Sequence, residues 1–476
     1  MKYDYIVLGA GVAGLAFAYK IAEHGKSVLV LEKENRVGGL SRTFSYRGFM
    51  FDLCAHRFHS ANETLLREVT EIVGPSFEKH AQRSRIYMFN KYLKYPFELH
   101  EVIGAMPPFE AVQAAGSYCL NLLLKRVLEK HIASYKSYKD WFVYHFGHKL
   151  YTVMCRPYAT KVWKTGPSNI SADWADQRFQ TPNVTKLMQK TVRKLIRLDL
   201  SSYSLEDQAL APDGGEFYHG VTGAHEIPDA FCERIRAMNC PVLTDTQVTA
   251  ISSRAQRVEY RFMDRQRAAC AREAIVSTIP LHACYALGDE EDVRVDAALR
   301  DLRYMDIICV YLFLNKEKVS NAHWIYFPDK DVIFNRSAEF KTISREMAPA
   351  NETALCLDIT CFEGDQTWNQ TDSDLVAACV DSAERVGLLT KSEVFDSAVV
   401  RANCAYPFYD LAYKTKVREV VEFLERDKTL FCLGRTGLFR YNNTDNSIEM
   451  GFELAKRLLE KRKESLIDYT IAHVSY

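Results

Sequence analysis

The sequence lacks an excess of charge of either sign and lacks any long hydrophobic run. Its 476 residues include 61 Lys and Arg against 61 Asp and Glu, so the basic excess that is typical of nucleic-acid-binding proteins is missing. No apolar run approaches the roughly 18 residues of a membrane-spanning helix. The first residues enter a strand pattern directly, without the apolar stretch of a signal peptide. We therefore expect a cytoplasmic protein that binds no nucleic acid and has no integral membrane segment.

Paired cysteines, low-complexity linkers and internal repeats are missing as well. The 13 Cys are too sparse for a disulfide scaffold and none forms a CxxC pair, so we interpret them as reduced core thiols and predict no metal site. Because no linker separates the predicted elements, the domains are expected to interleave along the chain.

Hydrophobic periodicity predicts the order of the elements. A βαβ unit is predicted at 4–31, and most of 98–200 carries helical stripes. Further strands are predicted at 84–96 (a hairpin), 241–252, 256–263, 274–280 and 429–434, and further helices at 61–73, 373–388, 414–425 and 448–463. Segments rich in β-forming residues predict an antiparallel sheet from 307–314, 324–327, 332–334 and 354–360.

Three glycines follow the first predicted strand, at Gly9, Gly11 and Gly14. In a GxGxxG turn between a strand and a helix, the first glycine allows the tight turn, the second lets the backbone approach a pyrophosphate, and the third packs helix on strand. Glu32 lies 23 residues after Gly9, at the end of the second strand. There its carboxylate can accept hydrogen bonds from ribose hydroxyls. The pattern predicts a dinucleotide site at the helix N-terminus.

Two further glycine segments indicate which dinucleotide is bound. Residues 38–41 resemble the second glycine pair of the glutathione-reductase-like FAD proteins, especially of their amine-oxidase branch, and 431–437 resembles the closing FAD motif of the same superfamily. The resemblance implies FAD, held by a set of residues drawn from the whole chain. These are Gly9, Gly11, Gly14, Glu32, Gly38, Gly39, Ser41, Val248, Gly434 and Arg435.

Several separated segments, in one order along the chain, resemble the flavin-dependent UDP-galactopyranose mutase family, and its eukaryotic-type pattern most. They are FDLCAH at 51–56, RPYATKVW at 156–163, the stretch from Trp174 to Asn183, WIYFP with the following FNR at 324–336, and the tyrosines at 406 and 441. The resemblance covers most of the chain.

This resemblance implies an α/β fold in which a Rossmann-like FAD-binding domain is interleaved with a helical subdomain and an antiparallel β-sheet substrate domain. The expected boundaries are 1–80, 201–290 and 411–476 for the FAD-binding parts, 81–97 for a hairpin of the sheet domain, 98–200 for the helical subdomain and 291–410 for the sheet domain. It also implies a homo-oligomer, since members of the family form dimers and tetramers.

The same resemblance assigns roles in the site. His56 is expected beside the flavin, and Arg178 and Arg336 are expected to hold the diphosphate of a nucleotide sugar, because the planar guanidinium donates parallel hydrogen bonds to phosphate oxygens. The expected substrate-binding residues are Tyr158, Trp163, Asn183, Tyr326, Tyr406 and Tyr441.

The implied reaction interconverts pyranose and furanose forms of UDP-galactose or a related nucleotide sugar, and feeds surface-glycan or specialised glycoside synthesis. Reduced FAD acts as the nucleophile, N5 forms a covalent adduct with the sugar, and the flavin is returned reduced. NADPH or NADH is the expected reductant. Arg83 and Arg85 lie in the segment that resembles the family's NADPH contact, although a solvated basic edge explains them equally well.

Two other functions stay open on the sequence. An FAD-dependent oxidoreductase of the amine-oxidase or protoporphyrinogen-oxidase type would use the same scaffold for net hydride removal, and a non-catalytic FAD-binding protein would bind the cofactor without turnover.

The chain also departs from the family pattern, because Cys54 and Ala55 replace two glycines before His56. Glycines there allow positive φ and a backbone shift, so this turn is expected to sit or move differently.

Overall fold

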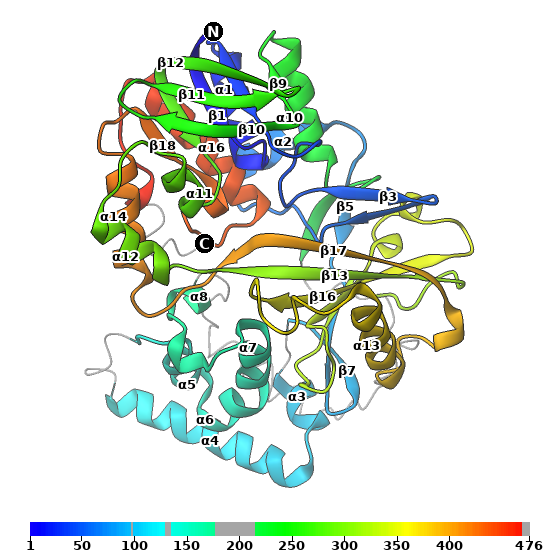
Figure 1. The fold of residues 1–476 in the computed structure, drawn as a ribbon. Helices are drawn as coiled ribbons and strands as arrows, with labels where there is room; N and C mark the ends of the chain where they lie inside the picture. Colours follow the sequence, from blue (N-terminus) through cyan, green and yellow to red (C-terminus); the bar gives the residue numbers. More distant parts are fainter. Residues whose placement is uncertain (97–98, 129–134, 177–214, 469–476) are drawn as a thin grey trace.

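The computed structural model describes residues 1–96, 99–128, 135–176 and 215–468 of the chain. Two seven-stranded sheets and a group of helices make up this part. In Figure 1 the first sheet lies at the top, the long strands of the second sheet cross the middle, and the helices of residues 99–176 lie below. The fold is therefore the predicted mixture of an α/β region, a helical region and a second sheet.

The first sheet is built around β1 (Lys2–Leu8), which pairs in parallel with β2 (Val28–Leu31) and with β12 (Arg265–Ser277). Its order is β10-β11-β12-β1-β2-β9, with β18 beside β12, where β9 is Val242–Leu243, β10 Thr246–Ser252, β11 Arg257–Phe262 and β18 Leu430–Cys432. Every residue of β2 is buried, as expected for a parallel strand covered on both faces. The predicted βαβ unit and the returning strand at 274–280 are confirmed.

Helices cover this sheet. One group is α1 (Val12–Glu23), α2 (Glu63–Val73), α10 (Glu226–Ala237) and α16 (Thr444–Leu459); the others are α11 (Leu281–Ala286), α12 (Val293–Asp301), α14 (Tyr413–Leu424) and the short α15 (Gly434–Gly437). Helix α1 packs against both α16 and α10. Gly451 of α16 allows this close approach, because a Cβ there would lie 2.6 Å from the Ala13 carbonyl oxygen.

The second sheet has the order β17-β13-β16-β15-β14-β6-β7. Its strands are β17 (Val394–Pro407), β13 (Tyr304–Leu314), β16 (Thr353–Cys361), β15 (Arg336–Glu339), β14 (Trp324–Tyr326), β6 (Ser84–Met88) and β7 (Lys91–Lys94). Strands β13 and β16 are buried along their whole length. Helix α13 (Asp372–Arg385) packs against β13.

One expectation about this sheet is confirmed and one is wrong. The segments predicted to form an antiparallel sheet pair antiparallel through β13, β16, β15 and β14, and β14 also pairs in parallel with β6. Residues 332–334 form a turn before β15 and not a strand. These residues are apolar because the side chains of Val332 and Phe334 are buried in the core. Their backbone pairs with no strand: the Phe334 carbonyl accepts a hydrogen bond from the Lys161 ammonium group instead.

The helical region is as predicted where it is described. It contains α3 (Leu99–Ala105), α4 (Pro108–Leu128), α5 (Tyr138–Phe146), α6 (His148–Leu150), a turn of π-helix at Tyr151–Cys155, α7 (Arg156–Trp163) and α8 (Asp173–Asp176). Ser137 and Asp140 form a capping box that begins α5. The last part of the stretch predicted to be helical, 177–200, lies outside the described residues. No helix in the described ranges is long and apolar enough to cross a membrane.

Two short strand pairs lie beside the two sheets. Strands β3 (Thr43–Tyr46) and β4 (Phe49–Asp52) form a hairpin, and β5 (Phe77–Ala81) pairs with β8 (Glu216–Gly220). Strand β4 packs against β16 and leads directly into the turn that carries His56.

Candidate active site

Three glycine-bearing loops meet at the N-terminus of α1. Gly9 and Gly11 stand between β1 and α1, and Gly38 N–H donates to the Ala10 carbonyl at 2.8 Å. A Cβ on Gly39 would lie 3.2 Å from the Gly11 Cα, and one on Gly434 would lie 2.9 Å from the Ala13 Cβ. Segments that are more than 400 residues apart in sequence, such as those of Gly9 and Gly434, therefore form one backbone cradle.

The glycines of the first turn have the different roles that a dinucleotide site needs. A Cβ on Gly14 would lie 2.4 Å from the Gly9 carbonyl oxygen, so this glycine is required for helix and strand to pack. A Cβ on Gly11 would meet no atom within 4 Å. The open space at Gly11 is where the second glycine lets a pyrophosphate approach, so the residues present fit the cofactor.

Glu32 is held in place at the other end of this cradle. It is only 7% exposed, and its carboxylate accepts hydrogen bonds from the Ala10 N–H at 2.7 Å and the Glu34 N–H at 3.0 Å. Its carbonyl accepts the N–H of Thr246, at the start of β10. Val248 follows two residues later, at a break in the β10–β11 register, which places it on the Glu32 side of the cradle.

Arg435 makes contacts that the motif did not predict. Its guanidinium donates to the carbonyls of Ala405 and Asn442 and lies 5.4 Å from the Tyr406 ring centroid and 4.9 Å from that of Tyr441. The side chain therefore joins the closing glycine segment to two of the predicted substrate tyrosines.

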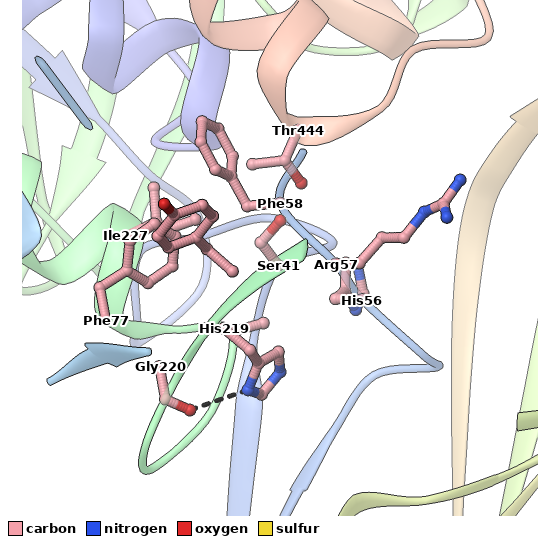
Figure 2. Close-up of a pocket in the computed structure, with 11 residues that line it drawn as sticks. Ser41, His56, Arg57, Phe58, Phe77, His219, Gly220, Ile227 and Thr444 are labelled. Carbon is pink, nitrogen blue, oxygen red and sulfur yellow. Dashed lines mark hydrogen bonds between the residues drawn. The ribbon is translucent and has the colours of Figure 1, made fainter. Parts of the chain in front are cut away.

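The His56 turn borders a pocket that Figure 2 shows together with Ser41, Arg57 and Thr444. The imidazole Nδ1 lies 3.1 Å from the Cys54 carbonyl oxygen. Burial lowers the pKa of His56 and the charges of Arg435 and Arg336 lower it further, against the opposing effect of Asp52. At neutral pH this ring is uncharged.

Cys54 adopts the backbone conformation expected for the glycine it replaces. Its φ is +66°, in the left-handed region that glycine occupies most easily. The turn directs the Cys54 side chain toward Cys309 of β13.

Arg336 stands on β15 opposite Asp358 of β16, and its neighbour across the other edge is Tyr326 of β14. Nε of Arg336 donates to Asp358 Oδ2 at 2.6 Å, and Nη2 pairs with the same oxygen. The Asp358 side chain is 4% exposed, so this buried aspartate holds the guanidinium in one orientation. Nη1 of Arg336 has no hydrogen-bond partner among the described residues.

Tyrosine rings surround this arginine. Tyr406 and Tyr441 lie nearly parallel, with centroids 5.8 Å apart and an interplanar angle of 16°. Tyr158 meets Tyr326 edge to face at 5.8 Å. Burial raises the pKa of Tyr406 strongly, although the Arg336 charge opposes the shift. The phenol stays protonated and can donate a hydrogen bond at any physiological pH.

The structure thus brings most of the predicted site residues together, and it leaves others elsewhere. Trp163 is 2% exposed and packs on Trp174 and Phe408; its indole N–H has no hydrogen-bond partner in the part of the chain described here. Arg178 and Asn183 lie outside the described residues, so their predicted roles stay predictions.

Arg83 and Arg85 are not a solvated basic edge. Arg83 Nη2 lies 3.1 Å from His323 Nε2 and donates to the Thr342 carbonyl at 3.0 Å. Arg85 is 8% exposed and lies on β6. Burial and the Arg83 charge lower the pKa of His323 to about 3, so a neutral imidazole faces the Arg83 guanidinium.

Sequence reasoning missed two charged groups next to the site. Asp358 is the one carboxylate within the apolar run 354–360, which was a usable signal. Asp52 and His219 form a buried pair at 2.8 Å, and His219 Nδ1 lies 2.8 Å from the Gly220 carbonyl oxygen. Both ring nitrogens of His219 face acceptors, so both carry a proton and the ring is a cation. Burial lowers the pKa of His219, but the charge and the hydrogen bond of Asp52 outweigh this effect and raise the pKa overall.

Comparison with known proteins gives the family and the fold that this chain resembles. The family profile described as flavin containing amine oxidoreductase matches residues 12–394. UDP-galactopyranose mutase of Mycoplasma pneumoniae is 35% identical over 107 residues, which are 21% of this chain and 26% of that protein. Protoporphyrinogen oxidase 2 of Arabidopsis thaliana is 22% identical over 492 residues, covering 94% of this chain and 91% of that protein.

Among solved structures, the crystal structure of reduced UDP-galactopyranose mutase matches with a TM-score of 0.82 at 19% identity, over 99% of this chain and 98% of that chain. This likeness shows the fold. The matched segment of the mycoplasma mutase is only about a quarter of its length, so its activity is not transferred by that match alone. The family profile, however, spans more than half of the sequence, and the chain belongs to the flavin-containing amine oxidoreductase family.

Proposed function

We propose that this flavoprotein is a nucleotide-sugar mutase that interconverts pyranose and furanose forms of UDP-galactose or a related nucleoside-diphosphate sugar, with FAD in its reduced form. The observation that carries the proposal is the arrangement of Arg336, fixed by the buried Asp358 and bordered by tyrosines. A diphosphate carries negative charge and several acceptor oxygens, which match the free Nη1 donors of Arg336 and nearby phenol groups.

The residues of this chain would act mainly by holding charge in place. Arg336 stabilises the negative charge that grows on the diphosphate as its bond to the sugar breaks. Asp358 keeps the guanidinium oriented throughout. Because the diphosphate stays bound, its return to the sugar is effectively intramolecular. The reduced flavin, when bound, supplies the nucleophile for the anomeric carbon.

His56 has a role compatible with its charge state. Its pKa is lowered, so the neutral ring can accept or donate one hydrogen bond beside the flavin without adding a second fixed cation to Arg336 and Arg435. Nδ1 faces the Cys54 carbonyl, so Nδ1 carries the proton and Nε2 is the available acceptor.

The alternative is an oxidoreductase of the amine-oxidase type, and one observation bears on it. The parallel Tyr406 and Tyr441 rings resemble a cage for a substrate ammonium group. However, the Arg435 guanidinium already lies over both rings, at 5.4 and 4.9 Å. A substrate cation would meet this charge and that of Arg336, so the site favours an anion.

The electron donor follows as a separate proposal: NADPH or NADH reduces the flavin, with Arg83 and Arg85 near the nucleotide. Stopped-flow reduction by each nucleotide, in the wild type and in Arg83→Ala, tests it. We expect a preference for NADPH and a higher dissociation constant in the variant; equal reduction of both proteins would remove Arg83 from the role.

The function itself is tested with a panel of UDP-, dTDP- and GDP-sugars. The protein is reduced, mixed with each sugar nucleotide, and quenched with cyanoborohydride, and the released flavin is weighed by mass spectrometry. We expect a flavin whose mass has increased by that of one sugar. An unchanged flavin with every sugar, from protein that reoxidises normally, would favour the oxidoreductase, and retained flavin without any turnover would favour a non-catalytic protein.

A further inference from the structure

Three thiols gather beneath the arginine site, and the proposed reaction uses none of them. Cys54 Sγ lies 3.2 Å from Cys309 Sγ, and Cys309 and Cys356 lie 3.8 and 3.3 Å from Asp358 Oδ1. Cys309 and Cys356 are fully buried, whereas Cys54 is 7% exposed. Cys54 and Cys309 are 255 residues apart in sequence, so the fold alone brings them together.

We propose that Cys54 and Cys309 are a redox-active pair that hydrogen peroxide converts into a disulfide, and that this bond ties the His56 turn to β13. The proposal concerns the thiols alone and does not rest on the mutase reaction. It assigns a modification site to the position where the family resemblance predicts a glycine.

The ligand set favours a disulfide over a metal site, because among the described residues it offers two facing thiols and a single carboxylate. The carboxylate that would complete a metal site, that of Asp358, is already bonded to Arg336. A disulfide of about 2.0 Å needs the two sulfur atoms to approach by about 1.2 Å, which a side-chain rotation and a small shift of the turn can supply.

The chemistry balances with peroxide as the named oxidant. The Cys54 sulfur attacks one peroxide oxygen, the O–O bond breaks, and the departing oxygen leaves as water with the thiol proton, giving a sulfenic acid. The Cys309 sulfur then attacks the Cys54 sulfur, and the sulfenic oxygen leaves as a second water. Two thiols and one peroxide become one disulfide and two waters. Cys54 is the first nucleophile because it alone of the three is partly accessible.

Burial of the two thiols makes the oxidation slow, and the resulting disulfide would restrain the His56 turn. The hydrogen bond to Cys309 and burial raise the pKa of Cys54, and burial raises that of Cys309, so little thiolate is present and we expect slower oxidation than at an exposed thiol. The Cys54 carbonyl holds His56 Nδ1. A disulfide between Cys54 and Cys309 would therefore restrain His56. It would also remove the thiol hydrogen bond from Cys309 to Asp358.

The test is peptide mapping of the flavin-loaded protein. The protein is treated with hydrogen peroxide, denatured in iodoacetamide and digested without reductant. We expect a linked peptide that contains Cys54 and Cys309, which dithiothreitol removes. The linked peptide should persist in Cys356→Ala, a matched thiol of the same cluster, and disappear in Cys54→Gly. The latter variant restores the residue that suits the positive φ, and flavin retention checks its fold.

Three outcomes would overturn the proposal. The first is a Cys309–Cys356 link in place of the Cys54–Cys309 link. The second is alkylation of both Cys54 and Cys309 under conditions that oxidise the exposed Cys119. The third is a metal ion, measured by elemental analysis after dialysis against EDTA, that is bound by the wild type and lost in Cys54→Gly, which would replace the redox pair with a metal site. Each result is independent of whether the protein turns over a nucleotide sugar.

Discussion

The two seven-stranded sheets build their parts of the candidate site differently, one from backbone and the other from side chains. At the first sheet the site is made of backbone: glycines that leave space, and N–H groups at the start of α1. At the second sheet it is made of side chains, where Arg336, Asp358 and Tyr326 come from three adjacent strands. A backbone site has a local sequence spacing, whereas a side-chain site depends on strand register. A backbone site can therefore be recognised by a sequence motif, whereas a side-chain site can be recognised only from the topology or from a family resemblance.

The largest effect is expected at the buried ion pair between Asp52 of β4 and His219 of β8. Replacing His219 with Leu leaves Asp52 charged and buried without its partner, and should cost about 3–5 kcal/mol of folding free energy. The pair contributes fully between the unfolded pKa values of Asp and His, about 3.9 and 6.5. Its contribution is lost as pH falls through the lowered pKa of Asp52 or rises through the raised pKa of His219.

Urea unfolding at several pH values measures this cost. His24→Leu serves as the control because His24 is exposed, and it should change stability by less than about 0.5 kcal/mol. A His219→Leu cost that is the same at every pH would show that packing, and not charge, holds the two regions together.

Removal of the arginine should lower both turnover and stability. Arg336→Ala removes the group that stabilises charge on the diphosphate, and we expect turnover of the folded protein to fall about 10²- to 10³-fold with the flavin retained. Because the variant also leaves the buried Asp358 without its partner, it should be less stable than the wild type in urea. Arg345→Ala, at an exposed position, is the matched control and should be near wild type. Steady-state kinetics and the flavin absorbance measure both. Loss of flavin in Arg336→Ala would mean that the two sites are not separable.

The two glycines of the first turn should separate cofactor binding from packing. Gly14→Ala places a Cβ 2.4 Å from a backbone oxygen and should cost about 1–3 kcal/mol of stability. Gly11→Ala places a Cβ in open space, so it should fold normally and lose flavin affinity. Thermal unfolding of apoprotein and flavin titration measure the two effects; equal loss of stability in both variants would contradict the distinct roles.

The smallest effect is expected at one phenol. Tyr406→Phe keeps the ring stacked against Tyr441 and removes a hydrogen-bond donor, which is worth about 1 kcal/mol or about a fivefold rise in KM. Tyr260→Phe is the control because Tyr260 lies on β11 of the first sheet, whereas Arg336 lies on β15 of the second. An unchanged KM in Tyr406→Phe would show that the ring, and not its hydroxyl, contacts the substrate.

The same contrast explains what the sequence could and could not predict. The glycine motif, Glu32 and the returning strand at 274–280 are local or strongly apolar signals, and the structure places them together at the first sheet. The hairpin β3–β4 and the long strand β17 were not predicted, because β17 is only half-buried and lacks a continuous apolar pattern. Parallel pairing of β14 with β6 joins segments about 240 residues apart, which no local pattern encodes.

Side-chain contacts were the hardest to predict. The family resemblance named Arg336 and the tyrosines, yet it did not provide Asp358, because the partner of an arginine is set by register across two strands. It gave Arg435 a place near the cofactor, whereas the structure directs its guanidinium to the Tyr406 and Tyr441 rings. Cys54 was recognised as a departure, but its partner Cys309 became visible only in the folded chain.

Electron accounting under anaerobic conditions tests the central claim most directly. The flavin is reduced with one equivalent of dithionite, UDP-galactofuranose is added without any electron acceptor, and NMR follows the sugar while absorbance follows the flavin. The account predicts many molecules of UDP-galactopyranose per flavin, with the flavin still reduced at the end. No more than one product molecule per flavin, or a change in flavin oxidation state in proportion to product, would contradict it and assign the site to an oxidoreductase.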